Sequence, residues 1–146
     1  MRLWHKDLIP YLPRQQLLGQ WRECCCIAKN IATTGNLNHI LVNKIMDFPL
    51  SNFYNYGVLI AKEMDKREYK CEFEKFSHWF TYPHETKTIK YYNVFKTWHN
   101  DRYLIQCMFN LEEKHDCQGV TDDEWNVLLK GYKEITGRDW EVDIPR

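Results

Sequence analysis

Residues 13–30 read PRQQLLGQWRECCCIAKN, and this stretch decides the fold class because its apolar residues recur with a helical period. Pro13 suits the first position of a helix, where its missing N–H costs nothing. One arc of the helical wheel collects the apolar side chains Leu17, Leu18, Trp21, Cys24, Cys25 and Ala28. The opposite arc carries Gln16, Gln20 and Glu23, with Arg22 at its border. The stretch therefore predicts an amphipathic helix from Pro13 to about Asn30.

Turn and capping residues divide the rest of the chain into further helices. The expected elements are an extended entry bracketed by Pro10 and Pro13, a turn over 33–36, a helix over 38–47, a helix capped by Ser51 and reaching Arg67, a helix capped by Asn100 and reaching Lys114, and a helix opened by the capping box Thr121–Glu124 and closed by Gly137. In residues 68–98 a strand over 89–95 competes with another helix. We predict an all-α, compact, single-domain helical bundle with a less regular central segment around 68–98.

Composition limits the class of protein. The 146 residues suit one domain, and the 15% aromatic content supports a self-sufficient core. The 20 acidic and 20 basic side chains cancel, so any DNA contact would need a local basic patch. No apolar run approaches the roughly 20 residues that span a bilayer. Charges at Arg2, Lys6 and Asp7 argue against a signal peptide. We expect a cytoplasmic protein with reduced thiols and no membrane partner.

Three consecutive cysteines, Cys24–Cys26, raise the question of a metal site. A structural zinc site needs four ligands around one point, usually from spaced pairs. Neighbouring side chains on a helix diverge by about 100°, so these three thiols cannot all bind one ion without unwinding the helix. The sequence favours Cys24 and Cys25 as small apolar core residues, with Cys26 facing the polar side. We therefore predict no metal site.

The first helix resembles that of the pyrimidine dimer DNA glycosylases. Residues 15–23, QQLLGQWRE, are similar to the segment Q-H-L-M-A-E-Y-R-E of the phage ultraviolet-repair member of that family, so Gln16 stands where that member has a histidine. The cellular branch of the family is more similar: it opens with MRLWH, continues with LPR-Q-LLGQ and RECC, and later carries an H-x-x-V-N element like residues 39–43. Residues 101–104, Cys107 and residues 110–111 resemble its later portion. The resemblance is specific over residues 1–25.

This resemblance implies a metal-free DNA N-glycosylase with associated abasic-site lyase activity and no cofactor. The implied nucleophile is the α-amine of Met1, which attacks C1′ of the damaged nucleotide and forms a Schiff base. An α-amine with a pKa of about 7.7–8 leaves roughly a tenth of its molecules neutral at pH 7. The implied catalytic carboxylate is Glu23, which would stabilise the cationic imine and move protons.

The implied partner is damaged double-stranded DNA, kinked and with a nucleotide extruded from the stack. Arg22 would contact phosphate. Trp4 and His5 are candidates for filling the gap, although Trp4 suits the core equally well. Lys29, Lys44 and Arg14 are either phosphate contacts or solvated charges, and His39 with Asn43 either faces the site or has a capping role. The full set of DNA-binding candidates is Arg2, Trp4, His5, Arg14, Gln16, Arg22, Lys29, His39, Asn43 and Lys44.

Two alternatives stay open on the sequence alone. One is a non-catalytic relative of the family, a helical module that binds nucleic acid or protein. The other is a thiol or metal protein, in which Cys26 would have a depressed pKa or the protein would hold zinc. Under the glycosylase interpretation and under both alternatives, we expect a single domain over residues 1–146.

Overall fold

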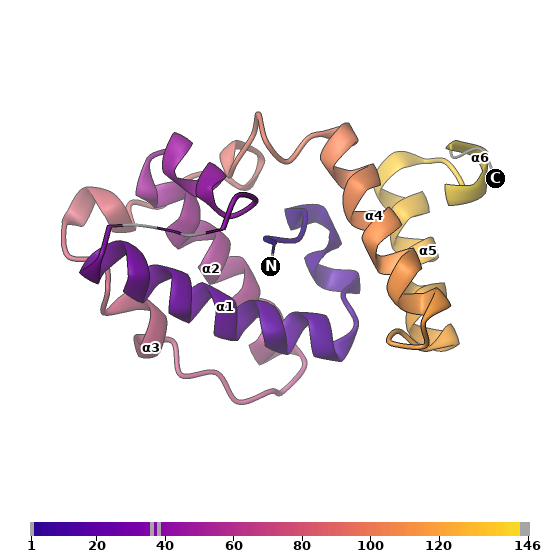
Figure 1. Ribbon diagram of the computed structural model, residues 1–146, viewed down its shortest axis with the longest axis horizontal. Helices are drawn as coiled ribbons and strands as arrows, with labels where there is room; N and C mark the ends of the chain where they lie inside the picture. Colours follow the sequence, from indigo (N-terminus) through magenta and orange to yellow (C-terminus); the bar gives the residue numbers. More distant parts are fainter. Residues whose placement is uncertain (1, 36, 38, 144–146) are drawn as a thin grey trace.

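The computed structural model describes residues 2–35, 37 and 39–143 (Figure 1). Within these residues the chain forms six α-helices, four short 3-10 helices and no strand. The α-helices are α1 (Arg14–Thr33), α2 (Leu50–Lys66), α3 (Glu74–Ser77), α4 (Asp101–Asp116), α5 (Asp122–Thr136) and α6 (Trp140–Asp143). The 3-10 helices are Lys6–Tyr11, Asn43–Asp47, Pro83–Thr86 and Tyr91–Asn93. The all-α prediction is confirmed.

Much of the chain between residues 2 and 12 is buried in the core of the molecule. Helices α1 and α2 pack together on the left of Figure 1, and α4 and α5 pack together on the right. The N-terminal segment, defined here as residues 2–12, contacts α2 and α5 through its 3-10 helix. Its buried apolar side chains are Leu3, Leu8, Ile9 and Leu12. Since each such burial contributes about 1.5–3 kcal/mol, this segment is a structural element and not a loose arm.

Helix α1 confirms the helix predicted from residues 13–30 and continues it to Thr33. Leu17, Trp21, Cys24 and Ala28 are buried as predicted. Gln20 contradicts the pattern, because it was placed on the solvent arc and is only 1% exposed. The N-terminal segment covers this part of α1, so the amide of Gln20 meets hydrogen-bonding groups of the protein instead of water.

Three predicted elements near the first two helices are wrong in detail. The entry between Pro10 and Pro13 is extended only at Leu12 and Pro13, because its first half belongs to the 3-10 helix Lys6–Tyr11, which begins where the ring of His5 accepts the Asp7 N–H. The helix predicted over 38–47 is reduced to the 3-10 helix Asn43–Asp47, and Asn38 lies outside the described residues. Helix α2 begins directly after Pro49, so Ser51 lies inside the helix and does not cap it.

The strand over 89–95, one of the two alternatives for this region, does not form, because its backbone groups have other partners. Asn52 on α2 accepts a hydrogen bond from the Phe95 N–H at 2.8 Å, and Asn55 accepts one from the Ile89 N–H at 3.3 Å. The side-chain nitrogen of Asn55 also donates to the Lys87 carbonyl. Phe95 has φ 50°, which no strand allows. Asn52 and Asn55 on α2 thus supply hydrogen bonds to this backbone that a neighbouring strand would otherwise supply.

The last two long helices have the ends that the sequence predicted. Asn100 accepts a hydrogen bond from the Tyr103 N–H and caps α4. Thr121 and Glu124 form a reciprocal capping box at the start of α5. Gly137 follows α5 with φ 77°, the left-handed conformation that favours glycine. Local chemistry alone defines these boundaries.

Candidate active site

The buried amide of Gln20 joins the start of the chain to Glu23. Its nitrogen donates to the Arg2 carbonyl at 3.1 Å and to Glu23 Oε2 at 3.2 Å. Its oxygen accepts the Trp4 N–H at 2.7 Å, and the Tyr56 hydroxyl lies 2.9 Å from it. Because the Trp4 N–H can only donate, the amide nitrogen must face Arg2 and Glu23. Both donors and the acceptor oxygen of one side chain are therefore fully used.

Helix α4 supplies a second wall to this site. The hydroxyl of Tyr103 donates to the Leu3 carbonyl, and the Arg2 guanidinium lies 3.9 Å from the sulfur of Cys107. Arg2 also lies over the ring of Trp4, 5.7 Å from its centroid. The backbone at Arg2–Trp4 is thus held from α1, α2 and α4. In the sequence, Tyr103 and Cys107 were noted only as part of the family resemblance, because nothing in their spacing signals this contact.

Among the described residues, Glu23 is the acidic side chain that the amide of Gln20 joins to Arg2. It is half-buried, and burial raises the pKa of its carboxyl above the ordinary value. The positive charges of Arg22 on α1 and Lys114 on α4 oppose that rise in pKa. A carboxyl group in this environment can exchange protons closer to neutral pH than a surface glutamate does.

Several cations near the site are available for an anionic ligand. Among the described residues, no carboxylate lies within ion-pair distance of Arg22, Arg102 or Lys114. A shallow groove by the N-terminus of α4 contains Lys44 and Arg102, and exposed Ile40 and Leu41 line it. Tyr103 lines the same groove and also donates to the Leu3 carbonyl. The groove therefore adjoins the N-terminal segment.

Two predicted DNA-contacting side chains lie in the core instead. Trp4 is 7% exposed and His5 is 2% exposed. The ring of His5 packs against His99 and Tyr103, with ring centroids 5.1 and 6.2 Å away. Their aromatic surface is used in packing, and neither can fill a gap in a DNA stack. Met1, the predicted nucleophile, lies outside the described residues.

The other predicted DNA-binding residues are dispersed. Gln16 is one helical turn before Gln20 on α1 and is half-buried, whereas Arg14 lies over Tyr69 at the start of that helix. Lys29 and Lys44 are exposed, and His39 is half-buried. The amide of Asn43 lies against the carbonyls of Leu37 and His39, where its nitrogen can donate to both. Asn43 therefore suits the capping role better than a ligand contact.

The cysteines have the positions that their helical spacing predicted. Cys24 is fully buried, Cys25 is partly buried and Cys26 is exposed. Burial raises the pKa of the Cys24 thiol well above its ordinary value, so it stays protonated. Within the described ranges no three His, Cys, Asp or Glu side chains are grouped so that they could hold a metal ion.

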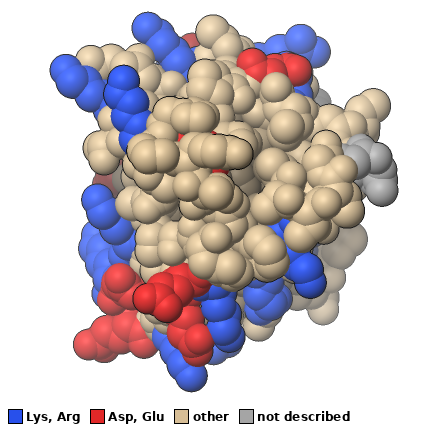
Figure 2. All heavy atoms as spheres, turned by 90° about the vertical axis from the view of Figure 1, so that its left-hand side faces the viewer, with Lys and Arg blue, Asp and Glu red and all other residues tan. Residues whose placement is uncertain are grey.

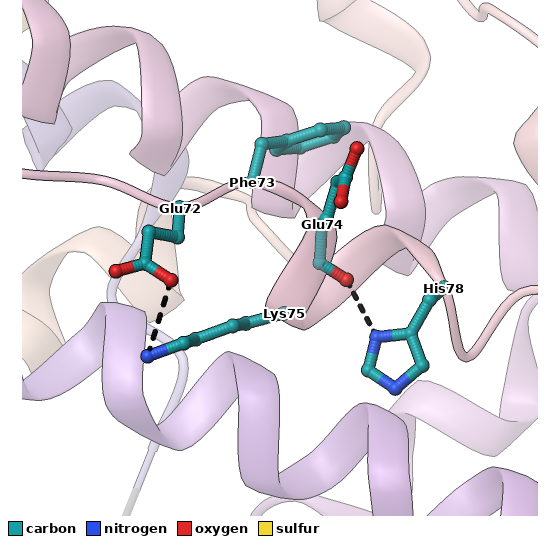
Figure 3. Close-up of a pocket in the computed structure, with 5 residues that line it drawn as sticks. All are labelled: Glu72, Phe73, Glu74, Lys75 and His78. Atoms are coloured by element: carbon teal, nitrogen blue, oxygen red, sulfur yellow. Dashed lines mark hydrogen bonds and ion pairs between the residues drawn. The ribbon is translucent and has the colours of Figure 1, made fainter.

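The hollow beside α3 lacks this chemistry. Figure 3 shows this hollow, lined by Glu72–Lys75 and His78, in which Lys75 pairs with Glu72 and the His78 ring contacts the Glu74 carbonyl. Figure 2 shows the face on the left of Figure 1, where uncharged residues occupy the centre and Lys and Arg lie mainly at the margin. Neither feature resembles a site for a polyanion.

No described helix is long and apolar enough to cross a membrane. The fold and the site together define an all-α protein with a glutamate hydrogen-bonded, through one amide, to the residue at position 2. The family model for pyrimidine dimer DNA glycosylases matches residues 1–76, just over half of the chain, and the protein belongs to that family. Comparison with curated proteins and with solved structures gave no match. Family membership makes it a DNA repair protein with DNA as its substrate.

Proposed function

We propose that the chain is a DNA N-glycosylase with associated abasic-site lyase activity, folded as one domain over residues 1–146. Its working groups are the α-amine of Met1 and the carboxylate of Glu23. The observation that carries this proposal is the bridge through Gln20, which joins the residue after Met1 to Glu23. An amine and a carboxylate held near each other can act on one sugar carbon.

The amine forms the bond to carbon, and Glu23 moves the protons. The neutral amine bonds to C1′ as the glycosidic bond breaks, and the base leaves with the proton that the amine loses. The carboxyl group of Glu23 gives a proton to O4′ as the C1′–O4′ bond breaks, and its carboxylate stabilises the cationic imine that results. The same carboxylate then takes a proton from C2′, the bond from C3′ to the phosphate oxygen breaks, and the strand is cut. Water finally hydrolyses the imine and returns the free amine.

Contacts to the DNA backbone would come from the cations around this site. Arg22 beside Glu23 is the first candidate because no described carboxylate pairs with it. Further candidates, dispersed over the surface, are Arg2, Arg14, Gln16, Lys29, His39 and Lys44, whereas Asn43 is assigned the capping role. The gap left by an extruded nucleotide would be filled by exposed apolar side chains, for which Ile40 and Leu41 replace the buried Trp4 and His5.

Borohydride trapping tests the proposal directly. The full-length protein is incubated with duplex DNA that carries either one abasic site or ultraviolet lesions, with undamaged duplex as the control. Reduction of the imine should give a covalent protein–DNA adduct with the damaged duplexes only. Absence of an adduct with both damaged duplexes, at every pH from 6 to 8, would favour a non-catalytic DNA-binding relative.

A second experiment identifies the nucleophile. Acetylation of the N-terminal amine should abolish the adduct, and intact-protein mass should show that Met1 is retained. Peptide mapping of the adduct should find the sugar on residue 1. A sugar on a lysine would refute the assignment of the amine while leaving the lyase activity in place.

A further inference from the structure

Gln20 has a role in the site beyond packing. It is the most buried polar side chain of the described core at 1% exposure, yet it lies directly beside a half-buried, titratable carboxyl. An apolar side chain of the same length would fill that space without needing four hydrogen-bond partners. The presence of an amide here therefore needs a reason.

The hydrogen bonds of Gln20 fix which of its ends faces Glu23. The acceptor end receives the Trp4 N–H at 2.7 Å, with the Tyr56 hydroxyl at 2.9 Å. Tyr56 is itself fully buried and also lies 2.7 Å from the Trp4 carbonyl. Turning the amide over would place two N–H groups against the Trp4 N–H, so the donor end stays directed at Glu23.

We propose that Gln20 is a positioning residue, which keeps Glu23 ionised and aimed at the start of the chain. An N–H donated to a carboxylate stabilises its charged form and lowers the pH at which it takes up a proton. The second N–H of the same amide donates to the Arg2 carbonyl. One planar amide group therefore fixes the position of the Glu23 carboxylate relative to the backbone at Arg2. This inference rests on the proposed function, in which the ionised Glu23 is required.

Other charged or titratable groups also face Glu23. Among the residues that the structure describes, these are Arg22 and Cys24 on α1, Tyr56 on α2 and Lys114 on α4. Burial raises the pKa of both Cys24 and Tyr56 well above the ordinary values, so these two stay neutral. The two cations favour the ionised carboxylate from the solvent side, and Gln20 does so from the buried side.

The test compares Gln20→Glu with Gln15→Glu. Both make the same chemical change on α1, but Gln15 is exposed. Gln20→Glu replaces the donor beside Glu23 by a second carboxyl, which should raise the pKa of the pair by a unit or more. Single-turnover strand cleavage should then fall about tenfold at pH 6 and less than about threefold at pH 8. Gln15→Glu should follow the wild-type pH profile.

The outcomes separate three cases. The positioning role is supported if the acid limb of the cleavage profile moves to higher pH in Gln20→Glu and does not move in Gln15→Glu. An equal loss of cleavage at every pH, or an unchanged profile, overturns it. If the wild-type protein forms no borohydride adduct, the proposed function fails and the role of Gln20 is judged by the NMR measurement below.

That NMR measurement needs neither activity nor a destabilising variant. In the wild-type protein, the side-chain amide resonances of Gln20 should move with pH in step with the side-chain carboxyl carbon of Glu23. The movement should disappear in Glu23→Gln, which removes the titrating group. Gln20 amide resonances that stay fixed while Glu23 titrates would overturn the inference, including in the case where Gln20→Glu does not fold.

Discussion

The two ends of this chain are specified in different ways. Helix α5 depends on its neighbours in sequence, since Thr121 and Glu124 open it and Gly137 closes it. The N-terminal segment depends on distant residues, since its backbone is bonded by Gln20, Tyr103 and His99. The candidate site lies in the second kind of region. Long-range bonds can fix a carbonyl or an amine relative to a side chain on another helix, which no local cap can do.

The largest expected effect on strand cleavage comes from a substitution of Glu23, whose carboxylate accepts a hydrogen bond from Gln20. Glu23→Gln keeps the shape and removes the charge, so strand cleavage should fall on the order of a thousandfold. The dissociation constant for uncleaved duplex should change little, and electrophoretic mobility shifts under the same salt conditions would measure it. Cleavage at the wild-type rate would remove Glu23 from the mechanism.

The next effect comes from loosening the N-terminal segment without touching the site. The Arg67 guanidinium on the far end of α2 donates to the carbonyls of Leu12 at 2.7 Å and Pro10 at 3.2 Å. It also pairs with Glu63 at 2.7 Å. Since bonds to a charged group contribute about 1.5–3 kcal/mol, Arg67→Ala should lower the free energy of unfolding by about 2–3 kcal/mol.

Chemical denaturation measures that loss of stability, and the strand-cleavage assay measures whether the change also impairs the candidate active site. Because the segment carries Arg2 and Trp4, cleavage by Arg67→Ala should fall even where the protein is fully folded. Lys66→Ala, an exposed neighbour, is the matched control and should leave both quantities unchanged. A stable Arg67→Ala variant would show that the Arg67 hydrogen bonds add nothing to the stability of the segment.

The same contrast explains what the sequence predicted and what it missed. Helical period and caps were enough for α1, α4 and α5, because those signals lie within a few residues of one another. The buried amide of Gln20 was missed, because its partners Trp4 and Tyr56 are far away in sequence. The 3-10 helix Lys6–Tyr11 was missed for a different reason, because the prolines indicated an extended entry and the local cap by the His5 ring was overlooked. Glu23 was found only through the family resemblance, since a glutamate on a polar arc carries no signal of its own.

Acid should destabilise the region of long-range bonds first. His99 accepts the Lys6 N–H at 2.9 Å, and burial lowers its pKa well below the ordinary value; burial also lowers the pKa of His5. The unfolded chain, with histidine pKa values near 6.5, therefore binds protons before the folded chain does. Stability from these neutral rings is complete above about pH 6.5 and declines as the pH falls below it.

Denaturation midpoints from pH 7.5 to 5 measure this decline. His99→Gln, although less stable at neutral pH, should show a flatter dependence on pH than the wild type. Hydrogen exchange at pH 5.5 should find the amides of residues 3–9 opening before those of α5. A decline of the same steepness in the variant would place the responsible group elsewhere.

The smallest effect is expected at the locally specified end. Thr121→Ala removes the hydroxyl that accepts the Glu124 N–H and should lower the free energy of unfolding by about 1 kcal/mol. Cleavage should stay at the wild-type rate, because the bond lies within the first turn of α5 and contacts neither Glu23 nor the residues that hold it. Thr121→Ser keeps the hydroxyl and should restore most of the stability. Equal losses of cleavage in Thr121→Ala and Arg67→Ala, measured where both are folded, would mean that the site responds to general stability and not to the position of the N-terminal segment.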